Sequence, residues 1–415
     1  MTVAASTNPM SRLADDPLIA QLRWAREEGL NPFFHSAEET VAPEVVVDGE
    51  RRIMLASANY LGFANHPEVV RGARDAIDRY GSTITGSRLL NGTIALHTEL
   101  EEELAAWTGR ESALVFTTGY QANLGTISSL LGREDTAVVD KSDHASLLDG
   151  CSLSRAKVRA FAHNRPERLR KALEQATRDG GATLVIVDGL YSMEGDLAPV
   201  DEIVSLCREF DVALMVDEAH SVGVFGERGT GTSELYGAEG QVDVFMGSLS
   251  KALGSVGGFI AGSQDLVDFL RLQARAFLFT TAGTPASIGA ALAAVRLRQT
   301  DEGAERAATV LDNARALRQG LADLGLAVRD PSPVPGGGDV VSQIVPVLIG
   351  EDLPAATWWR ALWQRGIFAS AAMYPAVKPS NAILRLCLMA THTREQVDRT
   401  IAAFEDVRRE LGLPR

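Results

Sequence analysis

The segment Val242-Asp243-Val244-Phe245-Met246-Gly247-Ser248-Leu249-Ser250-Lys251-Ala252-Leu253-Gly254 couples an apolar run to a lysine-bearing loop of small residues. Val242–Met246 has the length and composition of a buried β-strand. Lys251 follows it and is one of five lysines in a chain with thirty-five arginines. An amine secluded among Gly, Ser and Leu behind a strand predicts a pocket residue, with a solvated surface lysine as the alternative.

Six further apolar runs extend this pattern along the chain. They are continuous rather than alternating, and segments of helical length separate them. Such runs are typical of a parallel sheet covered by helices on both faces. The sequence therefore predicts an α/β fold whose large domain, residues 61–300, is built on a mainly parallel seven-stranded sheet. The six runs are Ala113–Thr117, Thr136–Asp140, Val158–Ala162, Leu184–Asp188, Ala213–Asp217 and Gly258–Ala261.

The residues outside this range predict two smaller parts. Residues 1–60 form an N-terminal arm, in which Pro17–Gly29 has helical spacing. Residues 301–415 mix helices and strands around a loop rich in Pro and Gly at 331–338, and they predict a small α+β C-terminal domain. Thr393 and Gln396 form a capping box for a final helix. Other helices are expected near 304–324 and 355–365, and strands at 342–348 and 383–388.

The charge and cysteine content argue against several classes of function. A net charge of −14 and a pI near 5.1 disfavour nucleic acid or an anionic membrane as a partner. Cys151, Cys207 and Cys387 have no metal-ligand spacing and suit reduced thiols, so no metal is expected. No segment has the composition of a signal peptide or a transmembrane helix, and we expect a cytoplasmic enzyme.

Two of the apolar runs lead into clusters that carry several acidic residues, and these clusters begin at Asp188 and Asp217. Because the carboxyl ends of parallel strands line one crevice, we expect these acids to meet the Lys251 loop. A lysine forms an imine with an aldehyde cofactor, and a carboxylate stabilises a protonated pyridine nitrogen. Lys251 and Asp217 therefore predict a site for pyridoxal 5'-phosphate (PLP). An N-cap of the following turn is the alternative role of Asp217.

Two histidines and several hydroxyls also follow strands. His144 is a candidate to lie flat against a planar ring, and His220 follows the second acidic run; a plain loop role is the alternative for both. Phosphate binding requires backbone N–H groups, hydroxyls and a helix N-terminus. Residues 117–123 meet this need, with Gly119 permitting close approach, and two serines flank Lys251. The sequence lacks a dinucleotide fingerprint and a Walker loop.

Eight ordered blocks make the chain resemble the α-oxoamine synthases, PLP enzymes of fold type I that include serine palmitoyltransferase and 8-amino-7-oxononanoate synthase. The resemblance runs from about Trp24 to the C-terminal helix, and it implies a PLP-dependent transferase fold and a PLP-dependent acyltransferase. The blocks are Asn59-Tyr60-Leu61-Gly62, Gly86-Ser87-Arg88-Leu89-Leu90-Asn91-Gly92-Thr93, Thr118-Gly119-Tyr120-Gln121-Ala122-Asn123, Asp143-His144-Ala145-Ser146, Tyr191-Ser192-Met193-Glu194-Gly195-Asp196, Asp217-Glu218-Ala219-His220-Ser221, Ser248-Leu249-Ser250-Lys251 and Phe279-Thr280-Thr281.

The resemblance also implies roles for single residues. Lys251 is similar to the Schiff-base lysine, and Asp217 to the partner of the pyridine nitrogen. The other cofactor-binding matches are His144 on the ring face, Ser192 and His220 at the phenolic oxygen, and Gly119, Tyr120 and Ser248 on the phosphate side.

Two further pairs of residues match family positions that concern partners. Thr280 and Thr281 match residues that reach the phosphate from the neighbouring subunit, which implies a homodimer with shared active sites. Asn59 and Arg385 match the pair that handles the amino-acid carboxylate, a task that suits a planar guanidinium. Without the resemblance, the apolar residues around Arg385 predict a strand residue that is paired across a sheet.

The implied reaction is a decarboxylative, Claisen-type condensation of a small α-amino acid with an acyl thioester, giving an α-amino ketone, CO2 and a free thiol. Gly86–Thr93 and residues 375–380 favour a serine palmitoyltransferase-like enzyme. The alternatives are an 8-amino-7-oxononanoate synthase using alanine and a pimeloyl thioester, a PLP aminotransferase or aldolase, and an inactive partner subunit, which typically lacks the lysine.

The thioester carrier stays open between coenzyme A and an acyl carrier protein. Residues 281–285 depart from the Ser-Leu-Pro-Pro segment that commonly follows the in-trans threonine in the family, so the substrate mouth is expected to differ. Because the chain is acidic, an acyl carrier protein requires a local basic docking patch. The candidates for this patch are Arg155, Arg159, Arg271 and Arg275.

Overall fold

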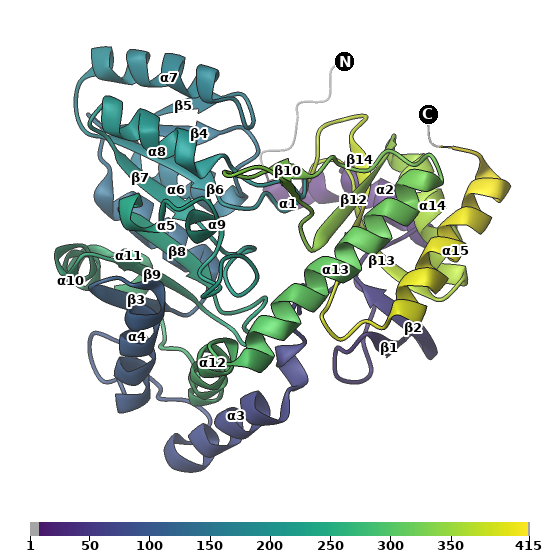
Figure 1. The fold of residues 1–415 in the computed structure, drawn as a ribbon, viewed down its shortest axis with the longest axis horizontal. Helices are drawn as coiled ribbons and strands as arrows, with labels where there is room; N and C mark the ends of the chain where they lie inside the picture. Colours follow the sequence, from purple (N-terminus) through teal and green to yellow (C-terminus); the bar gives the residue numbers. More distant parts are fainter. Residues whose placement is uncertain (1–7, 414–415) are drawn as a thin grey trace.

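A computed structural model describes residues 8–413 of the chain. Residues 1–7, which open the predicted N-terminal arm, and residues 414–415 lie outside the described part. Two sheets dominate the structure: a seven-stranded sheet with helices on both faces, and a five-stranded sheet with helices on one side. The long helix α13 (Asp301–Asp323) runs between them (Figure 1).

The prediction of a mainly parallel seven-stranded sheet is confirmed. Its strand order is β3-β9-β8-β7-β6-β4-β5, in which β9 pairs antiparallel with both neighbours and the other pairs are parallel. The strands are β3 (Ser112–Phe116), β4 (Thr136–Asp140), β5 (Lys157–Phe161), β6 (Thr183–Asp188), β7 (Ala213–Asp217), β8 (Val244–Ser248) and β9 (Gly258–Gly262).

Apart from the edge strand β5, which is mostly exposed, these strands are continuously apolar because they are buried on both faces. In β6, Val185 and Val187 pack into one hydrophobic core, whereas Leu184 and Ile186 pack into a second core on the opposite face. Successive strand residues point to opposite faces, so both sets have to be apolar. The helices that follow or flank the strands are α3 (Pro67–Tyr80), α4 (Ala95–Thr108), α5 (Gly119–Leu130), α6 (Ala145–Ser154), α7 (Pro166–Asp179), α8 (Val200–Glu209), α9 (Thr232–Leu235), α10 (Gln264–Gln273), α11 (Arg275–Leu278) and α12 (Pro285–Arg298).

Strand β8 differs from its predicted bounds. It begins at Val244 and extends to Ser248, so two residues assigned to the lysine loop belong to the strand. Gly247 permits this, because a Cβ there would lie 2.3 Å from Cε1 of Phe259 on β9. The lysine turn therefore starts later and lies closer to the carboxyl edge of the sheet than the sequence indicates.

The five-stranded sheet joins both ends of the chain. Its order is β1-β2-β13-β14-β12, and β2 pairs in parallel with β13. The N-terminal segment predicted as an arm thus supplies two strands to the C-terminal sheet, while the domain boundaries near residues 60 and 300 stay a prediction. The members are β1 (Glu44–Val47), β2 (Glu50–Leu55), β12 (Ile344–Gly350), β13 (Ile367–Ala372) and β14 (Ala382–Cys387), with α14 (Asp352–Gln364) and α15 (Arg394–Leu411) packed beside them.

Two local expectations can be compared directly. Thr393 and Gln396 form the predicted capping box at the start of α15. The loop rich in Pro and Gly contains a short hairpin of β10 (Ser332–Pro333) and β11 (Asp339–Val340), which the sequence did not predict. A hairpin this short leaves no periodic signal, because only two residue pairs are formed.

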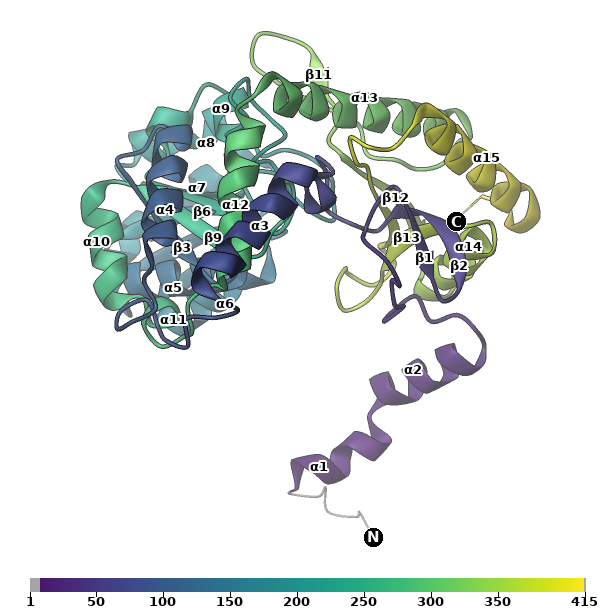
Figure 2. The same ribbon diagram turned by 90° about the horizontal axis from the view of Figure 1, so that it is seen from below.

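The N-terminal helices extend away from the two sheets. Figure 2 shows α1 (Pro9–Arg12) and α2 (Pro17–Glu27) projecting from the body of the molecule. Helix α2 has no buried residue, although Leu18 and Trp24 are apolar. Of the helices in the described range, none has the length and apolarity that crossing a membrane requires.

Helices α3 and α12 pack against each other through glycines, which generates a stability prediction. A Cβ on Gly289 would lie 2.3 Å from the carbonyl oxygen of Gly72. Although alanine is favoured over glycine in a helix by about 1 kcal/mol, we expect Gly289→Ala to lower the free energy of unfolding by about 1–3 kcal/mol through overpacking. Denaturant unfolding measures this change.

The matched control is Gly240→Ala, because a Cβ at Gly240 meets no atom within 4 Å. This variant should unfold at the denaturant concentration of the unsubstituted chain. A Gly289→Ala variant that is as stable as the control would contradict the close helix contact.

Candidate active site

The carboxyl ends of three adjacent strands bring together the acids and the lysine selected from the sequence. Asp188 and Asp217 are the last residues of β6 and β7 and are paired in register. Lys251 lies in the turn three residues beyond the end of β8, the next strand. The expected convergence at this edge of the sheet is therefore observed.

Asp217 is buried and held from two sides. Its Oδ2 accepts a hydrogen bond from Nδ2 of Asn123 on α5 at 2.7 Å, and its Oδ1 accepts one from the backbone N–H of Ala219 at 2.8 Å. The contact with the Ala219 N–H is the turn-capping role that the sequence left open. The contact with Asn123 has no such capping role. No Lys or Arg side chain of residues 8–413 lies within ion-pair distance of this carboxylate, so it retains capacity for a cationic ligand.

Lys251 has the environment of a reactive amine. Burial lowers its pKa, while the negative charges of Asp217 and Asp188 act in the opposite direction and Arg385 lowers it further. Within the described chain, its Nζ has no hydrogen-bond acceptor or ion-pair partner in the structure. An amine that is desolvated and unpartnered is more often neutral and therefore more nucleophilic than a surface lysine.

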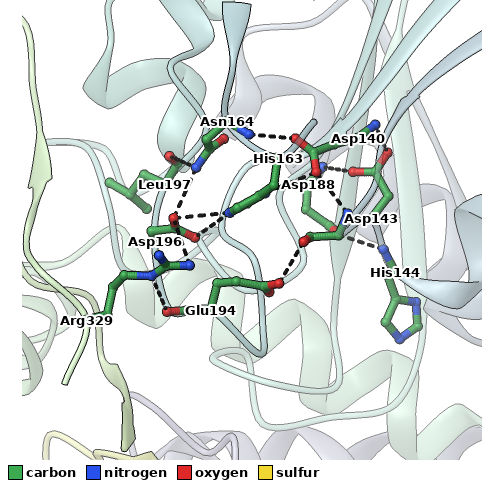
Figure 3. Close-up of polar contacts among 11 residues, drawn as sticks. Asp140, Asp143, His144, His163, Asn164, Asp188, Glu194, Asp196, Leu197 and Arg329 are labelled. Atoms are coloured by element: carbon green, nitrogen blue, oxygen red, sulfur yellow. Dashed lines mark hydrogen bonds and ion pairs between the residues drawn. The ribbon is translucent and has the colours of Figure 1, made fainter. Parts of the chain in front are cut away.

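His144 stands at the N-cap of α6 with its side chain only partly buried. Its backbone N–H donates to Oδ2 of Asp188 at 2.8 Å, and its Nδ1 lies 2.7 Å from the Ser146 hydroxyl. Burial lowers the pKa of the imidazole, an effect that Asp217 opposes and Lys251 reinforces. In Figure 3 the ring extends away from the acidic cluster that holds its backbone. The position suits a ring that lies against a planar ligand.

His220 is buried and oriented by Tyr60. The Tyr60 hydroxyl lies 2.7 Å from Nδ1 of His220. Burial lowers the pKa of His220 well below the usual histidine range, and the positive charge of Lys251 lowers it further. The ring is therefore neutral at pH 7, with its second nitrogen available for another partner.

The predicted phosphate side is formed where α5 begins. The Thr118 hydroxyl caps the helix by accepting from the backbone N–H of Gln121 at 3.2 Å. The backbone is tightly packed there, because a Cβ on Gly258 would lie 2.4 Å from Cα of Gly119. The Ser248 hydroxyl lies 2.8 Å from that of Ser250. Glycines, hydroxyls and a helix N-terminus thus occupy one corner, as a phosphate requires.

Three residues predicted for this corner have contacts of a different kind. The Tyr120 hydroxyl bonds to Asp149 on α6, and its side chain is 44% exposed. Thr280 Oγ1 accepts from Gln121 at 3.3 Å, and Thr281 O accepts from the Thr117 hydroxyl at 2.8 Å. Both threonines therefore lie beside the phosphate corner of their own chain.

The remaining predicted residues lie around the pocket. Ser192 is half-buried in the loop after β6. Arg385 lies on β14, and its buried Nε has no acceptor among the described residues. The Asn59 side chain is used locally: Oδ1 accepts from the Ala64 N–H at 3.1 Å and Nδ2 donates to the Val41 carbonyl at 3.3 Å. The structure thus leaves Arg385 with free binding capacity and commits much of Asn59 to the backbone.

Sequence reasoning missed Asn123 and Tyr60 as site residues. Both stand inside blocks that carried the family resemblance, but their partners are 94 and 160 residues away in the chain. The available signal for Asn123 is that a polar residue falls on the buried face of α5. A buried amide requires a partner, and a strand-end carboxylate was the nearest candidate.

The side chains present fit PLP. The amine without a partner, the buried carboxylate without a cation and the unsatisfied Arg385 Nε correspond to its aldehyde, its ring nitrogen and the carboxylate of its amino-acid ligand. The close backbone approach at Gly119 and Gly258 gives a phosphate access to main-chain N–H groups. No group of three or more metal-ligating side chains occurs within residues 8–413.

Comparisons with known proteins agree with this arrangement. The family model described as aminotransferase class I and II matches residues 50–404. The chain is 40% identical over 398 residues to an 8-amino-7-oxononanoate synthase of Geobacter sulfurreducens, which covers 95% of this chain and 99% of the relative. It is 38% identical over 378 residues to a serine palmitoyltransferase of Sphingobacterium spiritivorum, which covers 91% of each.

A solved structure of SPT with PLP superposes with a TM-score of 0.91 at 35% identity and covers 97% of this chain and 99% of that chain. The fold, the lysine and carboxylate at the strand ends, and these relatives lead to one assignment. The chain belongs to the class I and II aminotransferase family and, within it, to the α-oxoamine synthases, which are PLP-dependent acyltransferases.

Proposed function

We propose that the chain condenses a small α-amino acid with an acyl thioester in the manner of serine palmitoyltransferase, with L-serine as the first candidate. The observation that carries this proposal is that Lys251 follows the strand next to the one that ends at Asp217, with Arg385 near enough for its charge to lower the pKa of Lys251. An amine, a carboxylate and a guanidinium are the groups that an amino acid bound to PLP requires.

Each of the three has a distinct task. PLP, when bound, withdraws electrons from the α-carbon of an attached amino acid. Asp217 balances the positive charge of the ring nitrogen, because its carboxylate is buried and held in place by Asn123. Lys251 takes the proton from the α-carbon as general base, since its lowered pKa leaves the amine free of a proton more often.

The other pocket residues orient the reactants. His144 would lie along one face of the ring of PLP, while neutral His220 and Ser192 would hold its phenolic oxygen. Arg385 holds the carboxylate of the amino acid through its planar guanidinium. Asn59 assists Arg385 mainly by fixing the loop between β2 and α3, given its contacts to Ala64 and Val41.

A cavity of about 710 Å³ adjoins this pocket and is proposed to admit the acyl thioester. Its walls include Asp143, next to His144, and Ile383, two residues from Arg385. Met193, Tyr374 and Val377 add apolar surface suited to an acyl chain. The proposal leaves the thioester carrier open between CoA and an acyl carrier protein.

The basic patch expected for a carrier protein is partly neutralised. Arg159 pairs with Asp179, and Arg271 pairs with Asp268 and Glu101. Arg155 and Arg275 keep their charge unpaired by any acid of the described chain. These two arginines are therefore the part of the patch on which carrier-protein docking is proposed to depend.

A second candidate is 8-amino-7-oxononanoate synthesis from alanine and a pimeloyl thioester. It is favoured by the 40% identity to the Geobacter sulfurreducens enzyme, whereas the likeness to solved SPT structures favours serine. Both reactions use the same lysine and carboxylate, so the substrates alone distinguish them.

A homodimer with shared active sites is proposed for this enzyme. Large apolar side chains are exposed on α2 and near the Thr280 loop, among them Trp24, Leu90 and Phe279. If these side chains form one contiguous apolar surface, they suit a subunit interface. Thr280 and Thr281 lie at the edge of the phosphate corner, from which they can serve a partner's site.

Replacing the lysine tests the proposed chemistry. We expect Lys251→Ala to lower kcat by about 10²- to 10⁴-fold, because it removes the general base. In the unsubstituted enzyme, kcat should rise with pH through a pKa below that of an ordinary lysine, since burial lowers it. Steady-state kinetics with thiol detection measures both effects.

Lys157→Ala is the control, because Lys157 is an exposed lysine on β5. It should retain full turnover. Equal kcat in Lys251→Ala and the control would exclude Lys251 as the base.

A substrate panel distinguishes the two candidate reactions. Serine, alanine and glycine are each combined with palmitoyl and pimeloyl thioesters, and CO2, thiol and product mass are recorded. We expect the highest kcat/KM with serine and a long-chain acyl group. Preference for alanine with the pimeloyl group would assign the second candidate, and absence of CO2 and thiol with every pair would contradict condensation.

Subunit mixing tests whether Thr280 and Thr281 act in trans. Lys251→Ala and a Thr280→Ala/Thr281→Ala double variant are each expected to be impaired. If the threonines serve the partner's site, a mixed dimer contains one site with all residues intact and recovers activity. Absence of recovery in dimers shown to be mixed would mean that the threonines act within their own chain.

A further inference from the structure

His163 is a half-buried histidine to which the proposed reaction gives no task. It lies two residues beyond the end of β5. Its Nδ1 is 3.0 Å from Oδ1 of Asp140, the last residue of β4, and its Nε2 is 3.1 Å from Oδ2 of Asp196, in the loop after β6. Because β5, β4 and β6 are adjacent in the sheet, one imidazole connects the end of β4 with the loops that follow β5 and β6.

Both ring nitrogens therefore face carboxylates, which favours the protonated ring. Burial lowers the pKa of His163, but the hydrogen bonds to Asp140 and Asp196 outweigh it and raise the pKa to about 9. The nearby charged or titratable groups are Asp143, Asp188, Glu194 and Arg329, and the ring of Tyr191 packs edge-on at 4.4 Å. At neutral pH the imidazolium sits between two negative charges.

Asp140 fixes the first of two loops that reach the cofactor site. Its Oδ1 accepts from the Ser142 N–H at 2.8 Å, and Asp143 Oδ2 accepts from the Asp140 N–H at 2.8 Å. These hydrogen bonds fix the conformation of the loop 140–144, and His144 is the last residue of that loop. Figure 3 shows the chain of contacts from His163 through Asp140 to this loop.

Asp196 fixes the second loop, residues 188–197, which carries Ser192. Asn164 ties it to the first loop, donating through its backbone N–H to Asp140 Oδ2 at 2.9 Å and through Nδ2 to Asp196 Oδ2 at 3.2 Å. Arg329, outside the seven-stranded sheet, approaches Asp196 Oδ2 to 3.4 Å. His163 and its neighbour thus connect both loops and extend the connection toward the five-stranded sheet.

We propose that His163 is a positioning residue: its imidazolium clamps Asp140 and Asp196 so that His144 and Ser192 are held at the spacing that grips PLP. The inference rests on the proposed roles of His144 and Ser192. His163 itself is not among the residues assigned to PLP. A histidine with this double contact binds the two loops more tightly than a neutral amide, because each hydrogen bond is charge-assisted.

The test measures PLP binding rather than turnover. The PLP dissociation constant and the visible circular dichroism of bound PLP are recorded for His163→Gln, which keeps polarity and loses charge. We expect a dissociation constant at least tenfold higher and an altered dichroism at a temperature where the variant remains folded. The ratio of variant to unsubstituted constants should fall as pH rises through about 9, because the unsubstituted ring then loses its own charge.

His66→Gln is the matched control, since His66 pairs with Glu302 at 3.1 Å away from both loops. It should change the PLP dissociation constant by less than twofold. If His163→Gln fails to fold, Asp196→Asn replaces it, because that variant keeps the contact between His163 and Asp140 while weakening the second clamp. The same tenfold loss is expected.

Two outcomes overturn the proposal, and they are distinguishable. If His144→Ala weakens PLP binding but folded His163→Gln or Asp196→Asn binds PLP as the unsubstituted enzyme does, the clamp is refuted and the site stands. If His144→Ala and Ser192→Ala also leave PLP binding unchanged, the assigned cofactor contacts are refuted together with the clamp. Neither result depends on which amino acid or thioester the enzyme uses.

Discussion

Burial of negative charge at the carboxyl edge of the seven-stranded sheet is the constraint on which the site depends. Asp140, Asp143, Asp188 and Asp217 are all buried there. Burial raises the pKa of Asp143 and of Asp188 well above the usual range, and the neighbouring carboxylates raise both further. Such a cluster is stable only where hydrogen bonds and cations offset the charge. Backbone N–H groups and His163 supply part of this compensation, and we propose that the ring nitrogen of PLP would supply a cation beside Asp217.

Much of the large sheet and the centre of the site could be predicted from the sequence. Strands buried on both faces are continuous apolar runs, so β6 and β7 and the acids that end them are visible without a structure. Lys251 is visible because it is rare and follows such a run. The order of the strands places these residues together, which the parallel topology requires.

The rest depends on contacts that no local pattern encodes. Asn123 meets Asp217, and Tyr60 meets His220, across long separations in the chain. The pairing of β2 with β13 likewise joins segments more than three hundred residues apart, so the N-terminal strands were not expected in the C-terminal sheet. The contacts of His163 could not be predicted from a local pattern either, because they form only when the end of β4 and the loops after β5 and β6 come together. Tertiary geometry, rather than propensity, decides each of these cases.

The proposed catalysis requires both sheets to be correctly placed. Arg385 comes from β14 of the five-stranded sheet, whereas Lys251 and Asp217 come from the seven-stranded one. Gln343, beside β12, donates to the backbone carbonyl of His220 at 2.6 Å and joins the two sheets beside the site.

The residue to which PLP is covalently attached tests the central claim most directly. Borohydride reduction of the PLP-loaded enzyme followed by peptide mass spectrometry should place the pyridoxyl group on Lys251, and attachment to Lys141, Lys378 or no lysine would contradict it.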